Sequence, residues 1–419
     1  MIPSSDMNGF MTLFLVLLAL STFTELWLAA RHLKHVLRRR RAVPAPFRGQ
    51  IPLKTHRRAA DYTAMRTRFG MVEAVYGTFI ILFWTAGGGL ELFDHAWRAT
   101  GWSSLIVGIL FTLSVFTIGA VLEIPLTLYK TFRVETRFGF NRITLSMFVA
   151  DLVRRLVLFL IVGIPVVTAA LWLMNVAGDL WWLGVWLLWM SVSLLMVWAY
   201  PAWIAPMFNR FTPLASPRLR QRIQTLLKRT GFRARGIYVI DSSRRTSHGN
   251  AYFTGLGRSK RIVFFDTLLK TLTPREIEAV LAHELGHFKL AHVVKRMIAM
   301  FASGLLGLAL LGWLATQQWF YTGLGMSQPS THAALILFIM TSPVFTFFLQ
   351  PFFAWRSRTH EYEADRYAAT TTSAKALVSA LVKLYRDNAA TLTPDPVYSA
   401  FYDSHPPALR RITRLLGKP

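Results

Sequence analysis

Seven long apolar stretches constrain the fold of this chain more than any other feature. They lie at about residues 11–30, 72–93, 104–129, 156–176, 180–203, 297–316 and 333–354. Each is near the roughly 20 residues that a helix needs to cross the hydrocarbon core of a bilayer. The chain is 53% hydrophobic with a mean hydropathy of +0.38, which is too apolar for an ordinary soluble protein. We therefore expect a multi-span α-helical membrane protein.

The first stretch is predicted to stay in the membrane as an anchor and not to be removed as a signal peptide. No lysine or arginine precedes it, and no small-residue cleavage site follows it. Residues 31–41, RHLKHVLRRRR, follow it instead. Such a basic segment is typical of the cytoplasmic end of a span.

The positive charge of the chain indicates its orientation. If the N-terminus lies outside and the spans alternate, then 31–71, 130–155, 208–296 and 355–419 face the cytoplasm. These segments contain 46 of the 47 lysines and arginines, and only Arg98 lies outside. Membrane topology thus accounts for the net charge of +26, and we expect lipid contacts but no nucleic-acid partner. The C-terminus is predicted to be cytoplasmic.

The chain contains no cysteine, so a metal would have to be held by histidine, aspartate or glutamate. Together with the many arginines, this composition leads us to expect the inner membrane of a bacterium.

The cytoplasmic segment 208–296 is predicted to contain both helices and strands. We expect a helix at 216–231, strands at 236–240 and 261–266, and an extended stretch at 249–257.

A further helix is predicted to begin at Thr273. Thr273 is a good N-cap, Pro274 suits the first helical position, and Glu276 can complete a capping box. This helix is expected to continue through 280–292, VLAHELGHFKLAH.

Two histidines on that helix have the spacing of metal ligands. His283 and His287 are four residues apart and share one face, whereas Glu284 is displaced by about 100°. Two imidazoles so placed can bind one zinc ion, and the glutamate can then accept a proton from water. The alternative is a buried helix with incidental histidines.

The segment 357–369, SRTHEYEADRYAA, offers the third ligand. Glu361 and Asp365 share one helical face, so Glu361 is the predicted ligand and Asp365 would orient a ligand histidine. Glu363 points to the other side, and we expect its removal to affect neither metal nor activity. His292 and His360 are not expected to be ligands. The alternative for the acidic residues is a solvated helix face.

With HELGH at 283–287 and Glu361 four residues before Asp365, the chain resembles the type I integral-membrane CaaX prenyl endopeptidases. These are zinc metalloproteases with HExxH and ExxxD motifs. The resemblance covers essentially the whole chain. One motif, YDSHPPALRRI, has one more residue before the serine than the family pattern. The other similar motifs are ETRFGFNRIT (135–144), YPAWIAPMFNRFTPL (200–214) and NAYFTGLGRSKRIVFFDTLL (250–269).

The resemblance implies roles for particular residues. One Zn²⁺ per chain would be held by His283, His287 and Glu361, with Glu284 as general base. Asp365 would lie beside the ligands, and His405 would help to stabilise the oxyanion. Asn250 would hold a backbone group of the substrate. Arg411 would contact either the substrate or other residues of the protein itself. From the residues alone, His405 is equally a helix-start residue. Residues 249–257 could be a simple hairpin arm, or an edge that pairs with an extended peptide.

The resemblance also implies the fold class. Seven transmembrane helices would enclose a water-filled chamber, with a cytoplasmic-side α+β zinc protease domain of the gluzincin type. Glu25 and Glu123, inside predicted spans, are expected to face protein or a wet cavity; alternatively, Glu123 reaches water at the span end. The expected regions are 1–207 with spans 1–5, 208–296 with the HELGH helix, 297–354 with spans 6–7, and 355–419 with the third ligand.

The predicted function is cleavage of peptide bonds by metal-activated water in a membrane zinc endopeptidase. Its substrate would be a protein or peptide, prenylated or not, with CaaX-type processing as the leading interpretation. A membrane-protein quality-control protease without prenyl substrates is the alternative. A second alternative function is a non-catalytic membrane scaffold, but such a protein would have no reason to retain Glu284.

Overall fold

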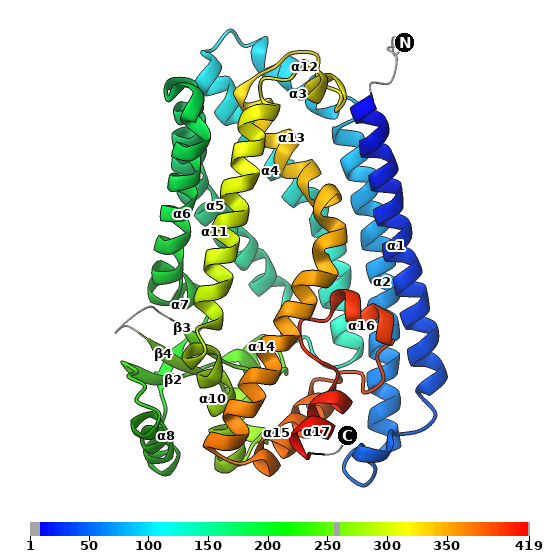
Figure 1. Ribbon diagram of the computed structural model, residues 1–419, viewed down its shortest axis with the longest axis vertical. Helices are drawn as coiled ribbons and strands as arrows, with labels where there is room; N and C mark the ends of the chain where they lie inside the picture. The colour runs from blue at the N-terminus through cyan, green and yellow to red at the C-terminus, as the bar shows by residue number, and fades with distance from the viewer. Residues whose placement is uncertain (1–8, 255–259, 418–419) are drawn as a thin grey trace.

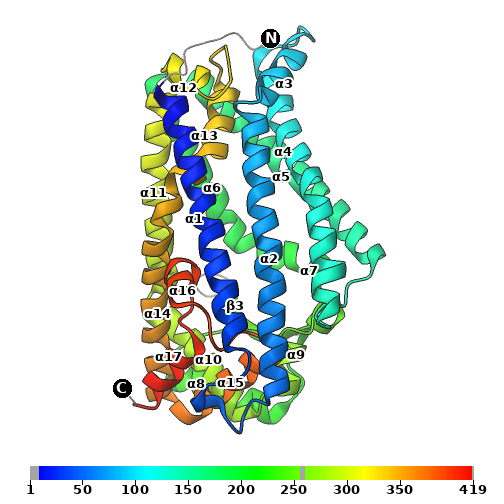
Figure 2. The same ribbon diagram turned by 90° about the vertical axis from the view of Figure 1, so that its right-hand side faces the viewer.

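The computed structural model describes residues 9–254 and 260–417, and its long helices form an elongated bundle (Figure 1). The two ends of the described chain lie at opposite ends of this bundle, as the second view also shows (Figure 2). The helices of the bundle are α1 (Gly9–Arg39), α2 (Leu53–Trp84), α3 (Gly89–Arg98), α4 (Ser104–Tyr129), α5 (Leu145–Val176), α6 (Trp181–Ala199), α7 (Ala205–Phe208), α11 (His292–Leu314), α12 (Gln318–Thr322), α13 (Thr331–Thr346) and α14 (Gln350–Thr371).

The helices confirm a multi-span membrane protein. Among the described residues, six helical stretches are long and apolar enough to cross a membrane, and the bent pair α2–α3 would make a seventh. α4 and α6 each continue into a π-helical stretch, at Lys130–Glu135 and Tyr200–Ile204. Each of the seven predicted apolar stretches therefore falls on one of these helical units.

The apolar side chains of the bundle lie both inside it and on its outer surface. Phe23, Phe79 and Leu306 are 68%, 66% and 72% exposed, which suits contact with lipid. An apolar core nevertheless forms between the helices at the end that carries α3 and α12. Its members include Trp84, Phe111, Leu171, Phe320 and Leu337.

A cavity of about 710 Å³ lies between α1, α2 and the segment around α16 (Pro396–Tyr402). Glu25 lies on its wall, as expected for a carboxylate within a span. Glu123 is exposed on α4 and is not among the described lining residues. The cavity extends to Asp403, two residues before His405. The bundle is therefore hollow on the side of the C-terminal segment.

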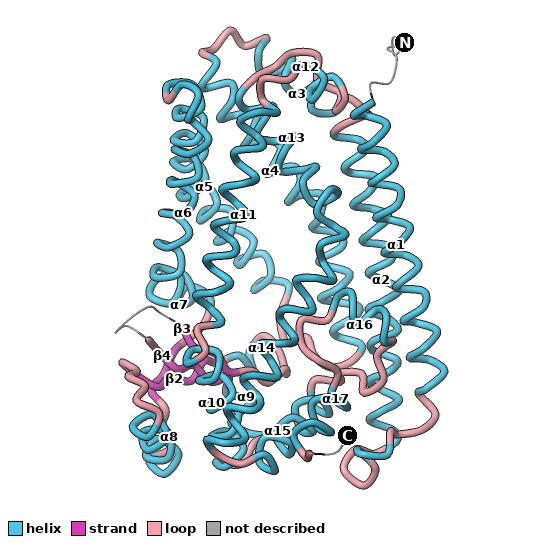
Figure 3. Tube along the Cα trace, in the orientation of Figure 1, coloured by secondary structure: helices cyan, strands magenta, loops and turns pink. Residues whose placement is uncertain are grey.

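The strands are confined to one end of the molecule (Figure 3). They form one sheet in the order β1-β2-β4-β3, in which β2 and β4 are parallel and the outer pairs antiparallel. The predicted strands at 236–240 and 261–266 are confirmed, and part of the extended stretch at 249–257 forms an edge strand; residues 255–257 lie outside the described residues. The bounds are β1 (Phe211–Pro213), β2 (Gly236–Ile240), β3 (Ala251–Thr254) and β4 (Arg261–Phe265).

Short helices complete this end of the molecule. The side chain of Ser216 caps the helix predicted at 216–231. The predicted capping box is also present, because Glu276 accepts from Thr273 N and the Thr273 side chain accepts from Glu276 N. The helices are α8 (Pro217–Arg229), α9 (Asp266–Thr271), α10 (Pro274–Lys289), α15 (Ala374–Asp387), α16 and α17 (Ala408–Leu415).

The predicted continuation of the histidine helix through residue 292 is wrong. α10 ends at Lys289, and Ala291 adopts a left-handed conformation with φ 56°. His292 instead begins α11. The sequence has no glycine or proline at this turn, so local turn signals do not reveal it.

Segments far apart in the sequence pack together around α10. It lies against α14 and α15, and its apolar face joins Leu281 and Leu285 to Ala368 and Leu377 in one buried core. α14 follows α13 after only a short 3₁₀ turn. The helix that carries Glu361 is thus a direct continuation of the last membrane span.

Candidate metal centre

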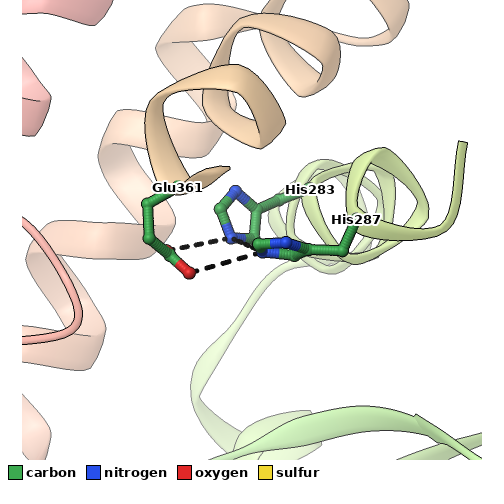
Figure 4. A group of neighbouring side chains, drawn as sticks. All are labelled: His283, His287 and Glu361. Carbon is green, nitrogen blue, oxygen red and sulfur yellow. Dashed lines mark hydrogen bonds and ion pairs between the residues drawn. The ribbon is translucent and has the colours of Figure 1, made fainter. Parts of the chain in front are cut away.

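Three predicted ligands converge between α10 and α14 (Figure 4). The Nε2 atoms of His283 and His287 are 3.3 Å apart. Glu361 places Oε2 3.5 Å from His283 Nε2 and Oε1 3.4 Å from His287 Nε2. Zinc bonds of 2.0–2.1 Å in a tetrahedron require ligand atoms about 3.3–3.4 Å apart. The separation of the two imidazole nitrogens matches that edge, and one or the other oxygen of Glu361 lies close enough to each histidine for the three side chains to share one cation.

The local sequence explains this convergence. The four-residue spacing aligns the histidines on one face of α10, and Gly286 between them lets α14 approach closely. A Cβ atom on Gly286 would be 3.0 Å from Ala364 Cα. Glu361 lies one turn before Ala364, so the close approach brings its carboxylate to the histidines.

Behind the ligands, Asp365 and Arg411 form a buried pair. Asp365 Oδ1 lies 2.9 Å from His283 Nδ1, as expected for a carboxylate that orients this ligand. Arg411 donates from Nε to Asp365 Oδ2 at 2.8 Å and from Nη2 to Oδ1 at 2.5 Å. Both side chains are almost completely buried. The arrangement leaves Asp365 little freedom to rotate.

The electrostatics of the cluster favour positive charge at its centre. Burial opposes protonation of His283, but Asp365 and Glu361 outweigh it and raise the pKa of His283 to about 9. Burial alone would raise the pKa of Glu361, yet the imidazoles of His283, His287 and His405 hold that pKa well below its ordinary value. Glu361 therefore stays ionised, as a cation ligand must.

Glu284 lies beside the ligands but is not held by them. Within the described part of the chain it has no hydrogen-bond or ion-pair partner, and its side chain is half-buried. Burial raises the pKa of its carboxyl group, although the neighbouring histidines act in the opposite direction. A carboxylate with unused lone pairs and a raised pKa is suited to accept a proton.

The remaining predicted residues are His405, Asn250 and Arg411. His405 is largely exposed and places Nδ1 2.8 Å from Glu361 Oε2, so it borders the open side. Asn250 is exposed at the start of edge strand β3, and its Oδ1 accepts from Ala251 N. Arg411 is buried and donates to Asp365. This placement favours a role in holding Asp365 over contact with substrate.

A second group near the site was not expected from the sequence. His292, His360 and Glu363 have ligand atoms within 4.8 Å of one another, and His292 also contacts His287. The sequence shows these histidines and the glutamate near the predicted ligands. It does not show the left-handed turn at Ala291 that places His292 beside His287.

Both halves of the chain are similar to known protein families. Residues 32–210 match the family model described as CAAX prenyl protease N-terminal, five membrane helices. Residues 213–418 match the model described as Peptidase family M48. The two models meet near the boundary between the spans and the sheet-bearing segment.

Two relatives match this chain along most of their length. A mouse protein named CAAX prenyl protease 1 homolog is 31% identical, over 93% of this chain and 92% of the relative. CAAX prenyl protease 1 of Saccharomyces cerevisiae is 31% identical, over 89% and 88%. The crystal structure of S. mikatae Ste24p superposes with a TM-score of 0.89 at 28% identity, covering 97% of this chain and 99% of that one.

Proposed function

Because the chain belongs to Peptidase family M48, we propose that it is a membrane zinc endopeptidase that processes the C-termini of prenylated CaaX-type proteins. The observation that carries the proposal is that His283, His287 and Glu361 meet within reach of one cation, beside Glu284, whose carboxylate has no partner among the described residues. One zinc ion per chain would be held by the first three residues.

The chemistry follows from the placement of the side chains. A bound zinc ion supplies a Lewis acid that polarises the scissile carbonyl and lowers the pKa of water. Glu284 takes the proton from the attacking water and returns it to the nitrogen of the leaving amine. His405 can donate a hydrogen bond to the oxygen that gains negative charge. Asp365 keeps the ring of His283 in the orientation that ligation needs.

The substrate is expected to bind as an extended chain along β3. This strand is at the edge of the sheet, so its backbone can pair with a peptide by strand addition. Asn250 at the start of the strand would hold a backbone group of the substrate. Arg411 would act on Asp365 and not on the peptide.

The proposed orientation places the N-terminus outside and the catalytic end of the bundle in the cytoplasm. The distribution of lysine and arginine supports it, because 46 of 47 lie in segments that would then be cytoplasmic. The inner membrane of a bacterium remains a proposal from composition, since the relatives described above are eukaryotic.

The decisive experiment is mass spectrometry of the products that the purified protein releases from one CaaX peptide, with and without its prenyl group. We expect release of the last three residues from both, because seven spans imply a wide chamber and the sequence shows no sign of a dedicated prenyl pocket. An unprenylated membrane protein is included as a third substrate, and cleavage of this protein without cleavage of either peptide would support the quality-control alternative. Activity that survives a strong zinc chelator would exclude the metal mechanism.

A further inference from the structure

The two histidine ligands are held from behind in different ways. His283 has a carboxylate directly at its second ring nitrogen, because Asp365 Oδ1 lies 2.9 Å from Nδ1. His287 has another imidazole in this position, with its Nδ1 3.0 Å from Nδ1 of His292. His292 then places Nε2 2.8 Å from Oε2 of Glu363. The carboxylate of Glu363 is thus linked to His287 through the ring of His292.

The backbone is shaped to place His292 there. The left-handed conformation of Ala291 is unfavourable for a residue that has a side chain, so other contacts must stabilise the turn. The side chain of His292 is 0% exposed. The ring of His360 stacks on it with centroids 4.1 Å apart and planes 9° apart. His292 is therefore held firmly between α14 and the end of α10.

The positions of the protons follow from ligation. When Nε2 of a neutral imidazole binds a cation, its proton is on Nδ1. Nδ1–H of His287 then donates to Nδ1 of His292, so the proton of His292 is on Nε2 and points at Glu363. Each donor faces an acceptor, and the chain of hydrogen bonds ends on a negative charge.

We infer that His292 and Glu363 are positioning residues that fix the ring of His287 and strengthen it as a metal ligand. Such partners fix the tautomer of a ligand histidine and raise its basicity. The inference rests on the proposed function, because it requires a cation on His287. It also revises the expectation that removal of Glu363 leaves metal binding unaffected.

His292, His360 and Glu363 could instead hold a second cation, since their ligand atoms lie close together. The protons argue against this. With cations on Nε2 of both His287 and His292, each Nδ1 would carry a proton, and two donors would face each other at 3.0 Å. In addition, 2.8 Å between His292 Nε2 and Glu363 Oε2 is a hydrogen-bond distance and shorter than the roughly 3.3 Å edge of a tetrahedral zinc site.

The test is the zinc affinity of the full-length protein, measured by competition with a chromophoric chelator. Glu363→Ala and His292→Ala should weaken zinc binding roughly 10- to 100-fold. Glu363→Gln keeps an acceptor oxygen without the charge, so its affinity should lie between Glu363→Ala and wild type. In the cobalt-substituted protein, the visible absorption bands of Glu363→Ala should shift, because the geometry around His287 changes.

The matched control is His360→Phe, which keeps a flat ring against His292 but removes both nitrogens. Nε2 of His360 has no hydrogen-bond partner among the described residues, so this variant should bind zinc as wild type does. Because Glu363 is 45% exposed, its substitution should not unfold the protein even if His292→Ala does.

Three results would overturn the inference. They are wild-type affinity and cobalt bands in Glu363→Ala, a loss in His360→Phe as large as in Glu363→Ala, or two zinc ions per chain. Failure of the proposed function has a different signature, because wild-type protein would then bind no zinc at all.

Discussion

Gly286 of α10 packs against Ala364 of α14 so closely that a Cβ atom on the glycine would be 3.0 Å from the Cα atom of the alanine. Ala364 is completely buried. The histidine helix and the carboxylate helix therefore meet at the one residue of the HELGH motif that has no side chain. This contact sets the distance between Glu361 and the two histidines.

Gly286→Ala should push the two helices apart. Overpacking a buried contact costs roughly 1–3 kcal/mol, so we expect a lower melting temperature and weaker zinc binding. Gly77→Ala is the matched control, because it also lies within a helix and a Cβ atom there would have no described atom within 4 Å. Unchanged zinc affinity in Gly286→Ala would show that the close approach does not control the site.

Glu284→Gln should separate catalysis from metal binding. The substitution keeps size and hydrogen bonding but removes the proton acceptor, so zinc should remain bound while peptide cleavage falls roughly 10²- to 10⁴-fold. Zinc content by elemental analysis and cleavage of a fluorogenic peptide would be measured on the same sample. A fully active Glu284→Gln protein would rule out the general-base role.

Glu361→Ala should behave differently from Glu284→Gln. It removes a ligand, so zinc content and activity should fall together. Retention of a full equivalent of zinc in this variant would mean that another residue completes the site.

Arg411→Met should destabilise the protein as well as the site. It leaves the buried carboxylate of Asp365 without its partner, and breaking a buried ion pair costs roughly 3–5 kcal/mol. The melting temperature and the zinc affinity should both fall, whereas the exposed neighbour in Arg410→Met should leave both unchanged. A raised KM with wild-type stability would instead indicate that Arg411 contacts substrate.

The C-terminus should lie in the cytoplasm. A reporter that is active only in the cytoplasm, fused after Pro419, should be active, and the same reporter placed between α3 and α4 at residues 99–103 should be inactive. The physical reason is the retention of positively charged loops on the cytoplasmic side. The opposite pattern would refute the orientation.

Local patterns in the sequence were sufficient for much of the site. The lengths of the apolar stretches predicted the spans, and the capping box predicted the start of α10 at Thr273 and Pro274. Helical periodicity placed His283 and His287 on one face and turned Glu361 rather than Glu363 toward them. Each of these features depends on residues a few positions apart, so the sequence by itself determined them.

Tertiary structure decided the features that join distant residues. The pairing of Asp365 with Arg411 and the edge position of β3 depend on how separate elements pack. The return of His292 to His287 depends on a left-handed alanine, a conformation that local propensity disfavours and that surrounding contacts must stabilise. Periodicity shows which way a side chain points from its own helix, but only packing determines what it meets there.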